Sequence, residues 1–459
     1  MPQRGETSMK QCRSEVKPGR RRWRHRKAGF AAGGVLVVVL TYLLVSQQLA
    51  ARARYVIITK AQWTTDEQLI RAPGATAEKE GTVSCSSEGY FSESCEVDGD
   101  VRVNGRVLTV TVVGPTNGSD PVEWRIRPYA QKYVGEVRKA TVTLVPGAPA
   151  AACTVAHTVP AVLFAIGGHS GRNFFHDYSD VLVPLFAASR RYGGEVQFLI
   201  SNVAWPQWLD KYHHLLRRLS RYPAVDLDAD DAPVRCFPHV TVGLHIHKLL
   251  TVVPESAPGG DGRCLTTADF TKFQREAYAL PRNATRRRGR RGRRGCWFVN
   301  VEEVARAAEA AGFEAVVTDL WAWGESDVAG KARTVNSFDA MLGVHGAGLT
   351  NAMFLPPGAV NIQVVPYGRM EAIARSEYGD PMTDMGLKYL EYVIDLQEST
   401  LLETLGPDHQ AIRDPEAVHR SGWDQVSEFY LKKQDVRVNI TRFAPTLAQA
   451  FHHLRQQLQ

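Results

Sequence analysis

Apolar and polar positions alternate in two different ways along the chain. From Cys95 to Gly147 the period is two residues, in EVDGDVRVNG, RVLTVTVVG and ATVTLVPG, with a hairpin signal at Asn104-Gly105. From Val159 onward, short apolar runs alternate with segments that have apolar residues at helical spacing. This second pattern predicts strands at 161–168, 195–201, 239–246, 314–318, 338–344 and 359–365, and helices at 179–191, 208–221, 301–311 and 445–459.

The second pattern divides into two αβ sets, separated by a basic segment that glycines interrupt. Two such sets predict an α/β fold with two Rossmann-like lobes facing a cleft, where ligands lie beyond the carboxyl ends of the strands. The predicted domains are a small β-rich entry segment at 81–150, a first αβ lobe at 151–281, and a second αβ lobe with C-terminal helices at 282–459.

The N-terminal region has the pattern of a membrane anchor. Residues 1–27 carry ten Lys and Arg against two Glu, and Ala28 to Val45 is apolar apart from Thr41 and the glycines. About twenty apolar residues span a bilayer as a helix, and a dense positive flank keeps its own end in the cytosol. We therefore expect a basic cytosolic tail at 1–27, a transmembrane signal anchor at 28–50 and a stem at 51–80. A cleaved signal peptide is the alternative.

The net charge of +7 is concentrated in two short segments. Residues 1–27 contribute +8, and the seven arginines of Arg286 to Arg294 add more, so the remainder of the chain is acidic. The basic balance therefore does not predict a nucleic-acid-binding body.

Two further features indicate that the bulk of the chain lies outside the cytosol. Asn117, Asn283 and Asn439 begin N-glycosylation sequons beyond the predicted anchor. Six cysteines also follow the anchor, an even number that suits an oxidising compartment. Cys85 and Cys95 are expected to form a local disulfide, and the remaining pairings stay open.

Leu342 to Pro357 places a glycine-rich turn between a predicted strand and a predicted helix. Gly346 and Gly348 allow close approach to the backbone, and the first helical N–H groups carry the positive end of the helix dipole. The turn therefore predicts an anion site suited to a diphosphate. A tight structural turn with two convenient glycines is the alternative.

A second strand-to-helix turn, Gly167 to Asp180, concentrates two histidines, two aspartates, an arginine and aromatic residues. A His or Asp backed by a second carboxylate can remove a proton from a hydroxyl. The candidates for this base are His176, Asp177 and Asp180. In the alternative reading, Asp177 or Ser179 only caps the following helix.

Two other clusters have the residue types of metal sites but favour structural roles. Asp226, Asp228 and Asp230 have the DxD spacing of sugar transferases that use a divalent metal, yet prolines flank them as in a solvated loop. His245 and His247 share one face of a predicted strand without an evident third ligand.

These motifs resemble glycosyltransferase family 61, whose plant members decorate xylan or the N-glycan core in the Golgi. The resemblance extends from about Cys85 to the C-terminus. It is carried by CSSEGYFSESCEVDGDVRVNG (85–105), RPYAQK (127–132), GGHSGRNFFHDYSDVLVPLF (167–186), GEVQFLISN (194–202), RCFPHVTVGLHIHK (235–248), LGVHGAGLTNAMFLPPGA (342–359) and MGLKYLEY (385–392). It implies a GT-B-like fold and an inverting transfer from a UDP-sugar, with no metal site in the DxD-like stretch and no cofactor or divalent metal required.

The resemblance also implies a single-pass type II Golgi membrane protein whose lumenal domain moves a pentose, arabinofuranose or xylose, to a xylan backbone or side chain. A β-1,2-xylosyltransferase for the N-glycan core is the second interpretation. A noncatalytic lumenal protein that binds a UDP-sugar or serves as a scaffold is the third. This last interpretation arises because NATRRRGRRGRRGCWFVN (283–300) stands where the family has an apolar strand, leaving only CWFV (296–299).

The expected partners are a UDP-pentose donor, a xylan or other glycan acceptor, the Golgi membrane through residues 28–50, and other Golgi glycosyltransferases, but no nucleic acid. The first lobe is expected on the acceptor side and the second on the nucleotide-sugar side. The donor would contact His345, Gly346, Ala347, Gly348, Leu349 and Asn351. The acceptor and its sugar would contact Arg172, Asn173, Phe175 and Tyr178.

Overall fold

A computed structural model of the chain describes residues 80–457 except 88–90, 116–119, 148–150, 172, 255–256, 261, 286–289, 293–297, 319 and 321–325, and describes only the backbone of 290–292. The described residues belong to one compact unit, Ala75–Gln459. The predicted cytosolic tail and membrane anchor lie outside the described residues. So do the stem up to residue 79 and the sequon at Asn117.

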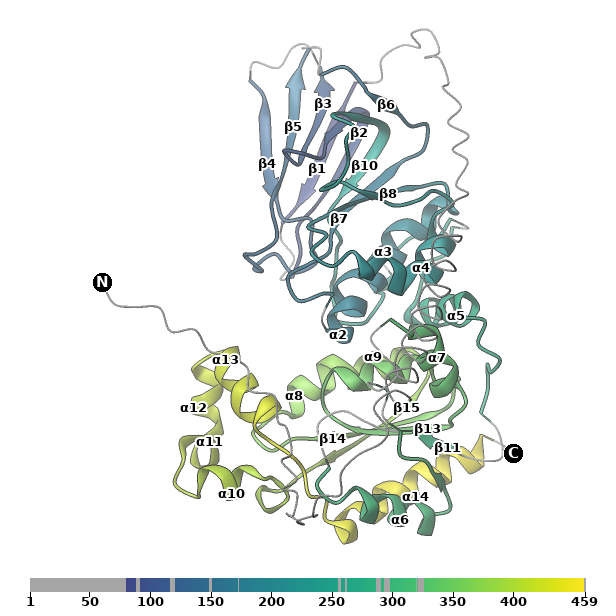
Figure 1. Cartoon of the computed structure of the whole chain (residues 1–459), viewed down its shortest axis with the longest axis vertical. Helices are drawn as coiled ribbons and strands as arrows, with labels where there is room; N and C mark the ends of the chain where they lie inside the picture. The colour runs from purple at the N-terminus through teal and green to yellow at the C-terminus, as the bar shows by residue number, and fades with distance from the viewer. Residues whose placement is uncertain are drawn as a thin grey trace, which may run out of the picture. The chain divides into compact units, whose positions relative to one another are not determined.

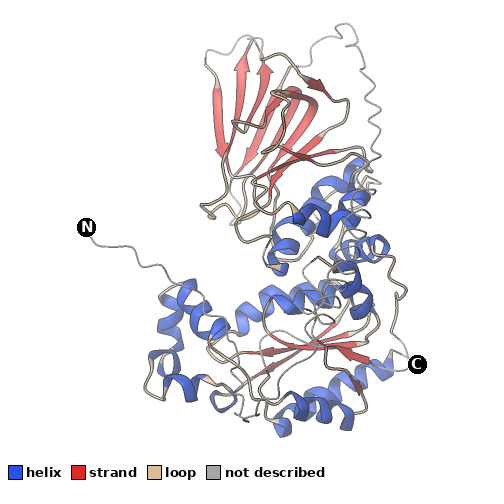
Figure 2. Ribbon diagram, in the orientation of Figure 1, coloured by secondary structure: helices blue, strands red, loops and turns tan. Residues whose placement is uncertain are grey.

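Ten strands of the N-terminal half form one mixed sheet (Figures 1 and 2). Its order is β4-β5-β3-β2-β10-β7-β8-β9, with β1 beside β2 and β6 beside β10. The strands are β1 (Thr82–Ser86), β2 (Ser94–Asn104), β3 (Thr109–Gly114), β4 (Val122–Ile126), β5 (Ala140–Pro146), β6 (Val155–Ala156), β7 (Ala161–Ala165), β8 (Gln197–Ser201), β9 (Val225–Asp226) and β10 (Arg235–Val242).

This sheet shows that the predicted fold class is wrong. β2 pairs antiparallel with β10, which pairs parallel with β7, so the β-rich entry segment and the first αβ set share one sheet. Val97, Val101 and Val103 of β2 lie in the same buried cluster as Phe237 and Val240 of β10. The entry segment and the first αβ set therefore share a buried core, and the described part of the first set does not form a separate Rossmann-like lobe.

In the part of the chain that the structure describes, every helix is too short or too polar to cross a bilayer.

The second sheet consists of parallel strands in the order β12-β11-β13-β14-β15. β11 lies inside the basic run, so the arginine-rich backbone takes the place of the apolar first strand that the sequence lacks. Phe298, from the CWFV stretch, forms an isolated bridge with Val436 outside the named strands. The strands are β11 (Arg290–Gly292), β12 (Glu314–Ala315), β13 (Ala340–Val344), β14 (Val360–Val365) and β15 (Lys388–Val393).

Helices cover both faces of the second sheet, with α6 and α14 on one face and α8 and α9 on the other (Figure 1). The α-helices are α2 (Phe174–His176), α3 (Val183–Ser189), α4 (Gln207–Leu219), α5 (Thr267–Ala277), α6 (Val301–Ala310), α7 (Val328–Asn336), α8 (Glu371–Ala374), α9 (Asp380–Asp384), α10 (Leu401–Leu405), α11 (Gln410–Arg413), α12 (Pro415–Arg420), α13 (Trp423–Val426) and α14 (Ile440–Gln456). Tighter and wider turns are the 3-10 helices η2 (Arg190–Tyr192), η4 (Ala347–Phe354) and η6 (Leu396–Glu398), and the π-helices η1 (Asp177–Leu182), η5 (Arg375–Gly379) and η7 (Ser427–Lys432).

One buried cluster joins residues that precede and follow the basic run. The ring of Phe354 in η4 lies 6.2 Å from that of Tyr178 in η1, and Phe175 lies 5.5 Å from Tyr378 in η5. These rings bury large apolar surfaces, and each fully buried side chain stabilises the fold by about 1.5–3 kcal/mol. The turn after β7 and the turn after β13 are therefore held together by a common core.

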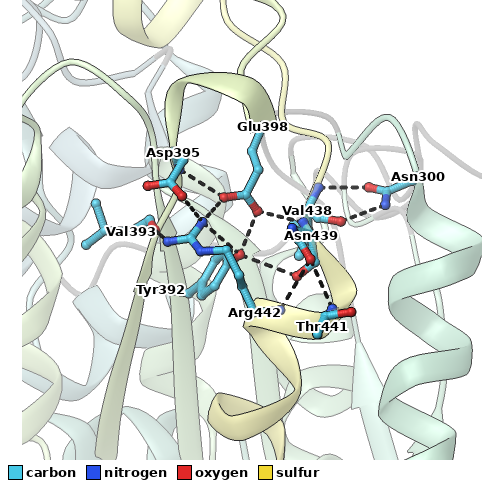
Figure 3. A network of polar contacts seen from close by, with 9 residues as sticks. All are labelled: Asn300, Tyr392, Val393, Asp395, Glu398, Val438, Asn439, Thr441 and Arg442. Carbon is cyan, nitrogen blue, oxygen red and sulfur yellow. Dashed lines mark hydrogen bonds and ion pairs between the residues drawn. The ribbon is translucent and has the colours of Figure 1, made fainter.

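A polar network fastens the start of α14 to the end of β15 (Figure 3). The buried Glu398 carboxylate accepts hydrogen bonds from the Tyr392 hydroxyl at 2.6 Å and the Asn439 backbone N–H at 2.6 Å, and it pairs with Arg442. Asn439 also caps α14, because its side-chain oxygen accepts from the backbone N–H groups of Thr441 and Arg442 at 3.1 and 3.3 Å. A predicted glycosylation residue thus has a structural role as well.

Among the described residues, two disulfides involve strands of the first sheet. Cys85 is joined to Cys95, which confirms the predicted local disulfide, and Cys153 is joined to Cys236. Cys264 is a free, exposed cysteine, and Cys296 lies outside the described residues.

Candidate active site

His176 and Asp180 form a hydrogen-bonded pair in the turn after β7. The helix begins at α2, widens into the π-helix η1, and places the two side chains four residues apart. His176 Nδ1 lies 3.0 Å from Asp180 Oδ2, which also accepts from the Tyr129 hydroxyl at 2.6 Å and from Gln131 Nε2 at 2.8 Å. Asp180 is fully buried, whereas the His176 side chain is 23% exposed.

This geometry suits proton abstraction by His176. The carboxylate holds the proton on Nδ1 and fixes the ring, so Nε2 carries the lone pair that can accept a proton. Among the described residues, no hydrogen bond involves Nε2. Burial, with the Asp180 charge beside it, raises the pKa of the Tyr129 hydroxyl, so Tyr129 remains a donor to the carboxylate.

Asp177, the other predicted carboxylate, is fully buried and saturated with hydrogen bonds. Its Oδ1 accepts from the Gly171 N–H at 2.5 Å and from Trp208 Nε1 at 2.9 Å. Its Oδ2 accepts from the Tyr212 hydroxyl at 2.6 Å and from Lys211 Nζ at 2.7 Å. Four donors occupy the carboxylate, so Asp177 fastens the turn to α4 and has no access to a substrate hydroxyl.

The predicted sugar-contacting residues lie in or beside the core. Asn173 caps α2 by accepting from the Phe175 N–H at 3.0 Å. Phe175 and Tyr178 are buried and pack on other rings, Tyr178 lying 5.8 Å from Tyr212. Arg172 lies outside the described residues. The described members of this group therefore support the turn from the side of the core.

The glycine-rich turn follows β13 as the sequence predicts, but it opens a 3-10 helix, η4. Gly346 has φ 145° and ψ 173°, a conformation that is essentially restricted to glycine. Gly346, Ala347 and Gly348 are partly exposed, and Leu349 is buried. The Leu349 N–H donates to the Gly346 carbonyl at 2.9 Å, so the Ala347 and Gly348 N–H groups are the ones left without a partner inside the helix.

Asn351 contributes to the same turn. It is 6% exposed, and its amide nitrogen donates to the Gly348 carbonyl at 3.0 Å. Its Oδ1 is buried and accepts no hydrogen bond from the described residues. A donor group of a bound molecule could satisfy it.

His345 is a buried, neutral imidazole. Burial lowers its pKa to about 4. Gln363 accepts from the Tyr389 hydroxyl at 3.0 Å and places its amide nitrogen 2.7 Å from His345 Nδ1. This arrangement puts the His345 proton on Nε2, which lies 3.5 Å from Glu377 Oε2.

Glu377 is a site residue that sequence reasoning missed. Burial raises the pKa of its carboxyl to about 7, although the charge of nearby His176 acts in the opposite direction. The next residue, Tyr378, donates its hydroxyl to the Gly346 carbonyl at 2.8 Å. The η5 turn therefore brings the His176 and Gly346 turns together, and the surrounding RSEYGDP carries no motif by which Glu377 could have been found.

The DxD-like aspartates are engaged with protein groups. Asp228 pairs with Arg138 at 2.6 Å, and Asp230 pairs with Arg235 at 2.8 Å, which lowers the pKa of Asp230. The rings of His245 and His247 lie 4.2 Å apart.

Among the described residues, Asp100, Cys153 and Cys236 lie close enough together to hold a metal ion, but the two cysteines are already joined in a disulfide.

Comparison with known proteins identifies the family. The model of the family Glycosyltransferase 61 matches residues 174–362, a range that contains His176, Asp180 and the whole glycine-rich turn after β13. The Beta-1,2-xylosyltransferase XYXT1 of Oryza sativa subsp. japonica is 39% identical over 405 residues, covering 81% of this chain and 84% of the relative. The Alpha-1,3-arabinosyltransferase XAT3 of the same plant is 38% identical over 386 residues, covering 81% of this chain and 65% of the relative.

The Xylan glycosyltransferase MUCI21 of Arabidopsis thaliana is 32% identical over 418 residues, covering 84% of this chain and 82% of the relative. The chain thus spans most of two of these relatives and just under two thirds of the arabinosyltransferase. The identity to these relatives and the share of each chain that it covers show that the chain belongs to glycosyltransferase family 61, a family of enzymes.

Proposed function

We propose that this protein transfers a pentose, arabinofuranose or xylose, from a UDP-sugar to the backbone or a side chain of xylan. The His176–Asp180 pair is the observation that supports the chemistry, because it has the geometry of an oriented general base. The names of the relatives, which include xylosyl-, arabinosyl- and xylan glycosyltransferases, support the choice of sugar and acceptor.

In the proposed reaction, His176 Nε2 takes the proton of an acceptor hydroxyl as the hydroxyl oxygen attacks the anomeric carbon of the donor. The bond from that carbon to the diphosphate oxygen breaks, and the electron pair leaves with UDP. Asp180 stabilises the imidazolium that forms, through its 3.0 Å contact with Nδ1. A single displacement of this kind inverts the anomeric configuration.

The leaving diphosphate would lie against the N–H groups of Ala347 and Gly348, at the N-terminus of η4. Fixed donors aimed at developing negative charge lower the barrier without reorganisation. His345 remains neutral because burial lowers its pKa to about 4, so it adds no full charge and positions Glu377. Leu349 supports this turn through its own backbone hydrogen bond.

We further propose that the reaction takes place in the Golgi lumen and requires no divalent metal or other cofactor. Support for an oxidising compartment comes from the two disulfides, Cys85–Cys95 and Cys153–Cys236. Support for metal independence comes from the ion pairs of Asp228 and Asp230 with arginines, which occupy the carboxylates that a DxD metal site would need.

The direct test incubates the purified protein with a panel of UDP-sugars and two acceptors, xylo-oligosaccharides and a biantennary N-glycan, in the presence of EDTA. Products are identified by mass. A pentose added to the xylo-oligosaccharide would support the proposal, whereas a pentose added only to the N-glycan would refute the acceptor. Binding of UDP without any transfer would favour a noncatalytic protein.

A further inference from the structure

Two large aromatic side chains are exposed beside the Gly167–Asn173 turn. Tyr133, between β4 and β5, is 59% exposed, and Trp205, between β8 and α4, is 36% exposed. Aromatic rings combine an apolar face with a polar edge, which suits the C–H face and the hydroxyls of a pyranose ring.

The side-chain amide of Gln131 links Tyr133 to the His176–Asp180 pair. Its hydroxyl donates to Gln131 Oε1 at 2.8 Å, and Gln131 Nε2 donates to Asp180 Oδ2 at 2.8 Å. The same loop packs on the turn itself, because a Cβ added at Gly168 would lie 2.7 Å from Val134 Cγ1. Tyr133 therefore lies on the Gly168 side of the turn.

Trp205 packs on the other part of the turn. Gly171 has φ +91°, and a Cβ added there would lie 2.5 Å from Trp205 Cδ1, so only glycine lets the indole lie directly on the backbone. His169, two residues earlier, has its ring 4.8 Å from that of His176. The segment with His169 thus lies beside the candidate base, between a contact with the loop that carries Tyr133 and a contact with Trp205.

We propose that Tyr133 and Trp205 form an acceptor platform on which pyranose rings of the xylan chain stack on both sides of the residue that receives the pentose. The proposal rests on the proposed function and names the groups that select its acceptor. Xylan carries no charge in its backbone, so stacking and hydrogen bonding supply its recognition. A longer xylan oligosaccharide offers more pyranose rings for stacking than a disaccharide, so it should bind better.

The test compares Trp205→Ala and Tyr133→Ala with controls that remove an exposed aromatic residue of the same type elsewhere. The controls are Trp423→Ala, 52% exposed in α13, and Tyr222→Ala, 36% exposed. The measured quantities are KM for xylohexaose, for xylobiose and for the donor. We expect each platform variant to raise KM for xylohexaose by about 10-fold, with a smaller rise for xylobiose and no change for the donor. Tyr133→Phe, which keeps the ring, should retain acceptor affinity.

Platform variants that behave like their controls would overturn the proposal, as would an equal effect on donor KM. Isothermal titration of xylohexaose into the wild-type protein and into Trp205→Ala measures acceptor binding without requiring transfer. A failure of this proposal can therefore be distinguished from a failure of the proposed function. Xylohexaose binding that Trp205→Ala weakens would support the platform even in a protein without transferase activity. Equal binding by both proteins, or tighter binding of the N-glycan than of xylohexaose, would refute it.

Discussion

Asp180→Asn tests the role of the carboxylate with a minimal change of shape. The amide oxygen can take the place of Oδ2 and accept from Tyr129, Gln131 and His176, as the carboxylate does. The amide nitrogen then replaces Oδ1, which is buried and without a hydrogen bond among the described residues. A buried, unpaired donor costs about 1–3 kcal/mol, so a modest loss of stability is expected and can be measured separately by thermal unfolding.

The catalytic effect follows from the charge that is lost. When His176 becomes an imidazolium, its charge lies about 4 Å from that of Asp180, and the attraction at an effective dielectric constant of 20 is about 4 kcal/mol. Because the His176 side chain is 23% exposed, solvent weakens this attraction, and we take about 3 kcal/mol. Since 1.36 kcal/mol corresponds to a tenfold change in rate, kcat should fall by about 100-fold.

The assay is single-turnover transfer with saturating donor and xylo-oligosaccharide, followed at a temperature where both proteins are folded. The matched control is Asp98→Asn, which removes a carboxylate that lies 3.0 Å from His239 and is 43% exposed. The control should keep nearly wild-type turnover. A folded Asp180→Asn protein with less than a threefold loss of kcat would refute the orienting role of Asp180.

Three further changes test other parts of the structure. Burial raises the pKa of Glu377 from 4.5 to about 7, so the folded state binds more protons than the unfolded state between these values, and the stability contribution of Glu377 falls as pH rises through them. Glu377→Gln should therefore increase the free energy of unfolding at pH 8 by about 3 kcal/mol relative to its effect at pH 4, measured by urea unfolding; a pH-independent effect would contradict this. Gly346→Ala should cost about 1–3 kcal/mol of stability and should also weaken UDP binding, measured by calorimetry. Its control is Gly386→Ala, at φ +81° with open space around it, which should affect stability alone. Thr441→Ala should abolish any glycan at Asn439, read by mass, with an unchanged melting temperature, whereas Asn439→Gln should also lose the cap of α14, worth about 1 kcal/mol.

Local features of this fold could be predicted from the sequence because they depend on neighbouring residues. The apolar run of β13 and the glycines after it locate the turn that carries Gly346, and the short spacing of Cys85 and Cys95 locates a disulfide. The pairing of β2 with β10 could not be predicted, because strand pairing joins segments more than a hundred residues apart and an alternating pattern does not name its partner.

The candidate site likewise combines features that could be predicted from the sequence with features that could not. The residues of the Gly167–Asp180 turn were candidates from their composition, but Asp177 and Asp180 look alike in sequence and differ only in their surroundings. Four donors occupy Asp177, while Asp180 pairs with His176 four residues earlier. Glu377 depends on a second π-helix that no residue pattern in its vicinity indicates. Roles that depend on tertiary contacts therefore became visible only in the structure.

The most direct test of the account is transfer by His176→Ala, measured together with UDP binding by calorimetry. Asp180, Gly346 and Glu377 remain in place in this variant, so donor binding should be unchanged. A general base contributes about 10²–10⁴-fold, and we predict a loss of pentose transfer to xylo-oligosaccharide of that size. Turnover close to that of the wild-type protein, with UDP bound normally, would remove His176 from the reaction and contradict the central claim.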